Sequence, residues 1–185
     1  SIHFPEIGTT ATDAETEIGI GKADENGENI SLNGQGNVFE VKRKIEDGTS
    51  TQPTTLSGTV DDSFMKYNNI ATSNKNYVET ITITEKNAPT GYEKYSKTIE
   101  FKVRKTYDKN TGKYIAAIAQ DTIKIGGVAQ TRGSSDYQYD NGNVKIDWSN
   151  NAITVKVKNK KIDIALKKTI TKVTDAKTNT EKEVT

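Results

Sequence analysis

β-branched residues dominate the apolar part of this 185-residue chain, and they restrict what it can fold into. The sequence contains 19 Ile, 11 Val and 26 Thr but only 3 Leu. Branching at Cβ limits side-chain freedom in a helix and suits the pleated surface of a sheet, so we expect an all-β fold. Alternating apolar and polar residues predict strands at 17–22, 37–43, 77–85, 97–105, 113–120, 122–125, 143–148, 152–159 and 161–166.

Turn signals separate these segments. Asn-Gly pairs at 26–27 and 141–142, for example, offer the positive φ that tight turns require. Many short strands joined by such turns predict a β-sandwich of antiparallel strands. The stretch 46–76 has the weakest pattern, and we expect a long loop there or one short helix near 62–67.

Charge and composition exclude several classes of function. The 26 Lys and Arg residues nearly balance the 25 Asp and Glu residues, giving a net charge of +1, so no nucleic-acid-binding surface is expected. No apolar run is long enough to insert into a membrane. The chain has no cysteine and a single histidine, His3, so we expect no disulfide, no metal site, no cofactor and no Ser-His-Asp triad.

Three polar residues stand in phase with apolar strand faces. Lys22, Glu85 and Asn159 each end a run of β-branched residues at the two-residue spacing that places side chains on one face of a strand. All three are therefore expected to point into the core. An unpaired charge there costs several kcal/mol, so these groups would need each other. Only 32% of the residues are hydrophobic, and a core this thin usually needs an additional stabilising link.

The three side chains together could form such a link. Burial favours the neutral forms of both a lysine and a glutamate, and a neutral amine is a nucleophile. The amine of Lys22 could then attack the side-chain carbonyl of Asn159, while Glu85 polarises that carbonyl and shuttles protons until ammonia leaves. The product would be an intramolecular isopeptide bond.

One segment resembles the signature of a known domain family. The sequence ITEKNAPTGY at 83–92 closely resembles the TETKAPEGY box of Cna-B-type and SpaA-like domains, which are repeat modules of Gram-positive surface adhesins and pilins. Glu85 falls on the glutamate of that box.

The two predicted end strands resemble the same family. The segments 18–27 and 37–41 are similar to its first strand, the following turn and the next strand, and Lys22 falls on the bond-forming lysine. The segment 154–161 is similar to its last strand, where Asn159 matches the acceptor.

This resemblance implies a fold, a chemistry and a location. The fold would be an Ig-like, prealbumin-like β-sandwich of the Cna-B type. Lys22 and Asn159 would be joined by an isopeptide bond with Glu85 as the catalytic proton shuttle, in a single turnover and with no other enzymatic activity. The chain would be a structural stalk module of an adhesin or pilus-like fibre, extracellular and at the cell surface or anchored to the cell wall. Its partners would be neighbouring modules or subunits of the same fibre.

The resemblance also predicts a domain organisation. Residues 1–16 are expected to be a linker or the edge of a preceding module, and 17–161 the β-sandwich. Residues 162–185 are expected to be a C-terminal linker, a donor strand or the first strand of a following module. The segment ending at Lys168 repeats the pattern of 17–22, which makes Lys168 a candidate lysine of that next module.

Two other functions fit the sequence. A ligand-binding sandwich would recognise a host protein or glycan through its loops, with 46–76 as the binding surface. A self-assembling fibre subunit would donate 1–16 or 162–185 as a strand to a neighbour. The simpler interpretation of the lysine and the asparagine is an exposed strand end, and that of the glutamate is a carboxylate that accepts backbone hydrogen bonds at a turn.

Overall fold

The computed structural model describes residues 15–46, 52–70, 76–131, 137–149 and 152–162. The predicted N-terminal segment 1–16 lies almost wholly outside these ranges, and so does the C-terminal segment with Lys168. Within them, no helix is long and apolar enough to cross a membrane.

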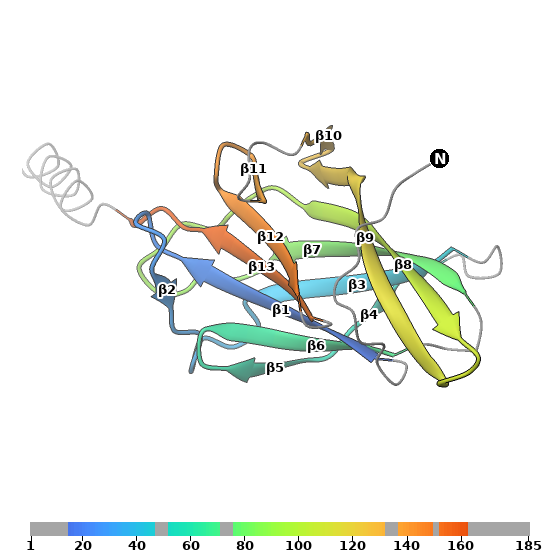
Figure 1. Ribbon diagram of the computed structural model, residues 1–185. Helices are drawn as coiled ribbons and strands as arrows, with labels where there is room; N and C mark the ends of the chain where they lie inside the picture. Colours follow the sequence, from blue (N-terminus) through green and yellow to red (C-terminus); the bar gives the residue numbers. More distant parts are fainter. Residues whose placement is uncertain (1–14, 47–51, 71–75, 132–136, 150–151, 163–185) are drawn as a thin grey trace, which may run out of the picture.

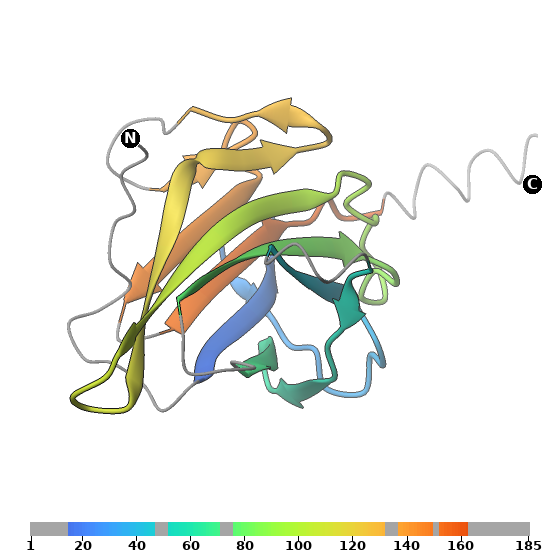
Figure 2. The same cartoon turned by 90° about the vertical axis from the view of Figure 1, so that its right-hand side faces the viewer.

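Two β-sheets face each other across one core, which confirms the predicted all-β sandwich (Figures 1 and 2). The described residues contain no helix. The seven-stranded sheet has the order β11 (Gln138–Tyr139), β12 (Val144–Ser149), β13 (Ala152–Lys158), β1 (Glu15–Ala23), β6 (Phe64–Ile70) and β5 (Gly58–Asp61), with β2 (Asn29–Ile30) paired to β1. The six-stranded sheet has the order β10 (Val128–Ala129), β9 (Lys113–Ile125), β8 (Ile99–Asp108), β7 (Tyr77–Glu85), β3 (Phe39–Ile45) and β4 (Thr54–Thr55).

The first and last strands of the described chain lie side by side, and they are parallel. In the β1–β13 pair Ile18 is opposite Ile153 and Lys22 is opposite Val157. This pair is the exception to the expected antiparallel arrangement, because all the other strand pairs of the described residues are antiparallel. Figure 1 shows the arrowheads of β1 and β13 at the same end of the sandwich. The parallel pairing therefore brings the C-terminal ends of both strands together.

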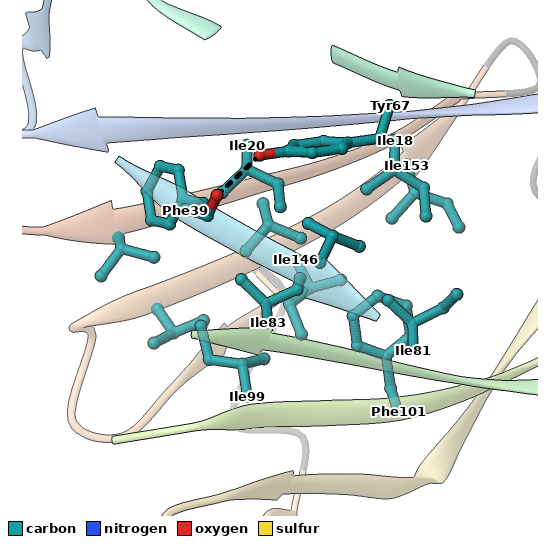
Figure 3. Close-up of a cluster of buried hydrophobic side chains, with 14 of the residues drawn as sticks. Ile18, Ile20, Phe39, Tyr67, Ile81, Ile83, Ile99, Phe101, Ile146 and Ile153 are labelled. Atoms are coloured by element: carbon teal, nitrogen blue, oxygen red, sulfur yellow. Dashed lines mark hydrogen bonds between the residues drawn. The ribbon is translucent and has the colours of Figure 1, made fainter. Parts of the chain in front are cut away.

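Alternate residues of the strands fill the core. The burial of β7 alternates along its whole length, as a strand with one face on the core requires. Figure 3 shows isoleucines of both sheets and Phe101 packed against one another. The hydroxyl of Tyr67 donates a hydrogen bond of 3.0 Å to the carbonyl of Phe39, which links the two sheets inside the core (Figure 3).

The region 46–76 differs most from its prediction. It contains β4, β5 and β6, and the last two form a hairpin around Asp62, which has a φ of 50°. The expected helix near 62–67 is wrong, because 62–63 form the hairpin turn and β6 begins at Phe64. Met65 and Tyr67 are buried and flank the half-buried Lys66. Pairing of β6 with β1, far away in sequence, stabilises this strand.

Other boundaries change in smaller ways. The strands expected at 113–120 and 122–125 are one strand, β9, whose pairing register with β8 shifts at 120–123, opposite the step from Glu100 to Lys102. The short strands β2, β10 and β11 were not predicted. Of the strand expected at 161–166, Lys161 forms an isolated bridge with Tyr92, and the positions after 162 lie outside the described residues.

Packing explains why two positions of β1 are glycines. The side chains of Ile18 and Ile20 point into the core, so Gly19 and Gly21 present the outer face of the strand. A Cβ at Gly21 would lie 2.8 Å from a ring carbon of Phe64 and 2.8 Å from a backbone oxygen. The ring of Phe64 therefore covers this stretch of β1 only because no side chain occupies it.

Candidate functional site

The structure brings Lys22, Glu85 and Asn159 to one end of the sandwich, in its interior. Lys22 is the penultimate residue of β1, Glu85 is the last residue of β7, and Asn159 directly follows β13. Their exposed fractions are 1%, 3% and 2%, respectively. The simple interpretation of Lys22 and Asn159 as exposed strand ends is therefore wrong, and the expectation that all three point inward is confirmed.

Lys22 and Glu85 form an ion pair that connects the two sheets. Nζ of Lys22 lies 2.5 Å from Oε1 of Glu85. The Lys22 ammonium also lies 5.9 Å from the centroid of the Phe39 ring, and Phe39 pairs with Glu85 in the β3–β7 ladder. Burial lowers the pKa of Lys22 below its ordinary value, although the hydrogen bond and the charge of Glu85 oppose this shift. The environment therefore favours the neutral amine more than water does.

Asn159 continues the parallel ladder beyond the end of β13. Its backbone N–H donates a hydrogen bond of 2.7 Å to the carbonyl of Ala23. Lys22 is opposite Val157, and Asn159 is two residues further along the same face. Strand spacing and rise place the Cα atoms of Lys22 and Asn159 about 8 Å apart, a span suited to the four-carbon stem of a lysine and a short asparagine side chain.

Three buried polar atoms of this site have no hydrogen-bond partner within the described part of the chain. They are Oδ1 and Nδ2 of Asn159 and Oε2 of Glu85. Buried polar groups are almost always paired, and leaving one unpaired costs about 1–3 kcal/mol. The unpaired atoms belong to the acceptor and the acid–base group that the isopeptide chemistry requires.

The segment that follows β7 covers the site. The backbone N–H of Tyr95 donates a hydrogen bond of 3.1 Å to Oε1 of Glu85, so the glutamate does accept a backbone hydrogen bond in addition to the lysine. Glu93 donates its N–H to the carbonyl of Lys160 over 2.8 Å, which ties the segment to the chain just after Asn159. A cavity of about 420 Å³ opens beside Asn159 and is lined by Tyr95, among others.

A second buried Lys–Glu pair was missed by the sequence reasoning. Glu79 and Lys105 are fully buried, and Nζ of Lys105 lies 3.7 Å from Oε1 of Glu79. Nε of Arg43 lies 3.3 Å from Oε2 of Glu79. Burial raises the pKa of Glu79, and the two cations oppose this shift. The signal was present, because Glu79 has the same spacing from the isoleucines of β7 as Glu85, and Lys105 is in phase with the buried residues of β8.

The two pairs differ in what surrounds the carboxylate. Each oxygen of Glu79 has a cation within 3.7 Å, whereas no cation of the described residues forms an ion pair with Oε2 of Glu85, and Asn159 follows the strand that pairs with Lys22. The geometry around Glu79 is that of a charge cluster holding β3, β7 and β8 together. The geometry around Glu85 brings an amine, a carboxyl group and a primary amide together at one buried end of the sandwich.

Comparisons with known proteins give a weak structural likeness. No protein-family model matches the chain, and a search of the curated proteins gives no match. A C-terminal fragment of the pilus adhesin SpaC from Lactobacillus rhamnosus GG is similar over 82% of this chain and 47% of the fragment, with 16% identity and a TM-score of 0.42. The open conformation of the same adhesin is similar over 82% of this chain and 15% of the adhesin, with 16% identity and a TM-score of 0.43. The chain thus spans less than half of either structure, and at these scores the likeness assigns no function to it.

Proposed function

We propose that this chain is a structural module of a cell-surface adhesin or pilus-like fibre, stabilised by an autocatalytic isopeptide bond between Lys22 and Asn159. The observation that supports this best is the buried ion pair of Lys22 and Glu85, with Asn159 two residues beyond the ladder partner of Lys22 and its amide atoms without a hydrogen-bond partner among the described residues. The proposed location is extracellular, and the proposed partners are neighbouring modules or subunits of the same fibre.

The proposed reaction balances without an oxidant or a metal. One proton moves from the ammonium of Lys22 to Glu85, and the neutral Nζ then attacks Cγ of Asn159 while the carboxyl group of Glu85 polarises Oδ1. One proton of the amine passes through Glu85 to Nδ2, which leaves as ammonia, and an amide replaces the original amide. The cavity beside Asn159 gives the ammonia a path to solvent. Each molecule reacts once, so the module is not an enzyme in the usual sense.

A bond at this position suits a protein under tension. Force that enters at the N-terminal end of β1 and leaves after β13 shears the parallel pair, because these two points lie at opposite ends of the sandwich. The cross-link joins the C-terminal ends of the same two strands. Tension would then run along β1, through the Lys22–Asn159 bond and out of the module, and the rest of the sandwich would not bear it.

Intact-protein mass spectrometry tests the cross-link. Folded wild-type protein is expected to weigh about 17 Da less than its sequence, the mass of one ammonia, and Lys22→Met, Glu85→Gln and Asn159→Ala are expected at full mass. Asn159→Asp is expected to lose about 18 Da, because water leaves in place of ammonia. The matched control is Glu79→Gln/Lys105→Met, which removes the other buried pair and is expected to keep the deficit.

Two outcomes would overturn the proposal. One is a full mass for folded wild-type protein. The other is a deficit that persists in Lys22→Met, because the lost ammonia would then come from another reaction. Tandem mass spectrometry of a digest should identify a branched peptide that joins Lys22 to Asn159.

A ligand-binding sandwich is the second candidate, favoured by a cavity at the open edge of the two sheets. This cavity of about 500 Å³ is lined by residues of the region 46–76, including Leu56, Met65 and Tyr67, and by Phe39 of β3. An array of host matrix proteins and glycans probed with the isolated chain tests this role. Binding that persists in Asn159→Ala would support a ligand-binding role. An array without binding would contradict that role and leave only the structural role.

The proposals of strand exchange and of a following module depend mostly on residues outside the described ranges. The proposals that 1–16 or 162–185 pair with a neighbour, and that Lys168 serves the next module as Lys22 serves this one, stay predictions.

A further inference from the structure

The carboxylate of Asp140 holds the segment that covers the reactive site. The hydroxyl of Tyr95 donates a hydrogen bond of 2.6 Å to Oδ2 of Asp140, and Nζ of Lys97 lies 2.8 Å from Oδ1. The side chain of Asp140 is only 11% exposed, whereas that of Lys97 is 49% exposed. The Tyr95 bond is therefore the more shielded of the two.

Tyr95 connects Asp140 to the proposed catalytic acid. Its hydroxyl binds Asp140, its ring packs against the hydrophobic core, and its backbone N–H donates to Oε1 of Glu85. Lys22 binds the same oxygen, so both contacts orient the carboxyl group, and Oε2 has no hydrogen-bond partner in the described part of the chain. A displacement of Tyr95 would release one of the two hydrogen bonds that orient Glu85.

The turn that carries Asp140 is itself tied to the acceptor strand. Asp140 has a φ of 52°, in the left-handed region, and its N–H donates to the side-chain oxygen of Gln130 over 3.0 Å. Its carbonyl accepts the N–H of Asn143 over 3.0 Å, and the carbonyl of Asn143 accepts the N–H of Lys158 over 2.8 Å. Lys158 directly precedes Asn159. A non-glycine residue in this conformation costs about 1–3 kcal/mol and persists where its surroundings hold it.

The Tyr95–Asp140 bond is stable to changes of pH around neutrality. The hydrogen bonds of Lys97 and Tyr95 lower the pKa of Asp140 against the opposing effect of its burial. Burial, together with the hydrogen bond and charge of Asp140, raises the pKa of Tyr95. Asp140 is thus ionised and Tyr95 protonated when Lys22 has to react.

We infer that Asp140 is a positioning residue for the Lys22–Asn159 cross-link, and that it acts through Tyr95 by holding one oxygen of Glu85 so that the other is left for Asn159. This inference rests on the proposed cross-link. Asp140 touches none of the reacting atoms, so it is not a catalytic residue.

The rate of cross-linking in fully folded protein tests the inference. Chain isolated in denaturant is refolded by dilution, quenched at intervals and weighed, at a temperature well below the unfolding midpoint of every variant. Tyr95→Phe and Asp140→Ala are each expected to slow the loss of ammonia about tenfold, the effect of weakening one charge-assisted hydrogen bond. Asp140→Asn keeps an acceptor at the same place and is expected to retain part of the rate. Lys97→Met, which removes only the exposed partner of Asp140, is expected to react at the wild-type rate.

A double-mutant cycle separates positioning from general destabilisation. If Asp140 acts through Tyr95, Tyr95→Phe/Asp140→Ala should be no slower than either single variant. Stability measured in an Asn159→Ala background, which cannot cross-link, shows whether each variant stays folded at the assay temperature. Wild-type rates in both single variants, or additive effects in the double variant, would overturn the inference. Wild-type protein that never loses ammonia would instead overturn the proposed function itself.

Discussion

Replacing the proposed acceptor, Asn159→Ala, should lower thermal stability sharply. The proposed cross-link would close a loop whose ends are 137 positions apart in the sequence. The chain-entropy estimate for a cross-link of that length is about 5 kcal/mol. For a protein of 150–250 residues, about 1 kcal/mol corresponds to a 2–4 °C change in Tm, so the expected fall is roughly 10–20 °C.

Changes in packing at Asn159 are smaller than this entropic effect. In cross-linked wild type Nδ2 of Asn159 has left as ammonia and Nζ of Lys22 is an amide nitrogen, so alanine removes the acyl group of the link and leaves a small cavity. In the variant Lys22 keeps its amine and its contact with Glu85. The loss of the closed loop therefore dominates the expected change.

Calorimetry and guanidinium unfolding measure the effect. The control is Asn37→Ala, which changes an exposed asparagine and should leave Tm nearly unchanged. The slope of unfolding free energy against denaturant should be larger for Asn159→Ala, because an unfolded chain without the cross-link exposes more surface. A fall in Tm smaller than about 3 °C, in samples whose masses show the bond present in wild type and absent in the variant, would refute the entropic reasoning.

Two further predictions concern groups outside the reactive site. Glu79→Gln removes the anion shared by Lys105 and Arg43 and should cost about 3–5 kcal/mol in urea unfolding, because a buried cation loses its counter-ion; an unchanged midpoint would contradict the assigned role of this cluster. Burial raises the pKa of Tyr67 to about 12, from an ordinary value of 10.0. The folded state thus holds this proton more tightly than the unfolded chain, so the stabilisation is present below about pH 10 and is lost as pH rises towards 12. Unfolding free energies measured over that range should decline more for wild type than for Tyr67→Phe, and parallel declines would contradict the assignment.

Strand periodicity predicts one property of the candidate site, the inward direction of its side chains. A side chain two positions from a buried isoleucine or valine lies on the same face, and this rule placed Lys22, Glu85 and Asn159 inside correctly. The same rule applies to Glu79 and Lys105, which were not singled out. Periodicity therefore predicts which polar residues are buried, but it does not distinguish a structural charge cluster from a candidate reactive site.

The error in the region 46–76 has a related cause. Local composition there is polar, and the alternation of Met65 and Tyr67 is too short to identify a strand. The strand β6 forms because it pairs with β1 and because Phe64 covers Gly21 on the outer face. These contacts join residues more than 40 positions apart, so the local sequence pattern does not predict them.

The sequence by itself determined the all-β class, most of the strands and the inward direction of the three site residues. These properties follow from β-branched side chains and the two-residue period, which depend only on neighbours along the chain. The tertiary structure decided which strands meet. The parallel β1–β13 pair places Asn159 two residues beyond the partner of Lys22, the facing sheet brings Glu85 to the lysine, and the turn at Asp140 holds the segment that covers them. Such pairings depend on contacts between residues that are distant in the chain, and the global packing of the sandwich selects them.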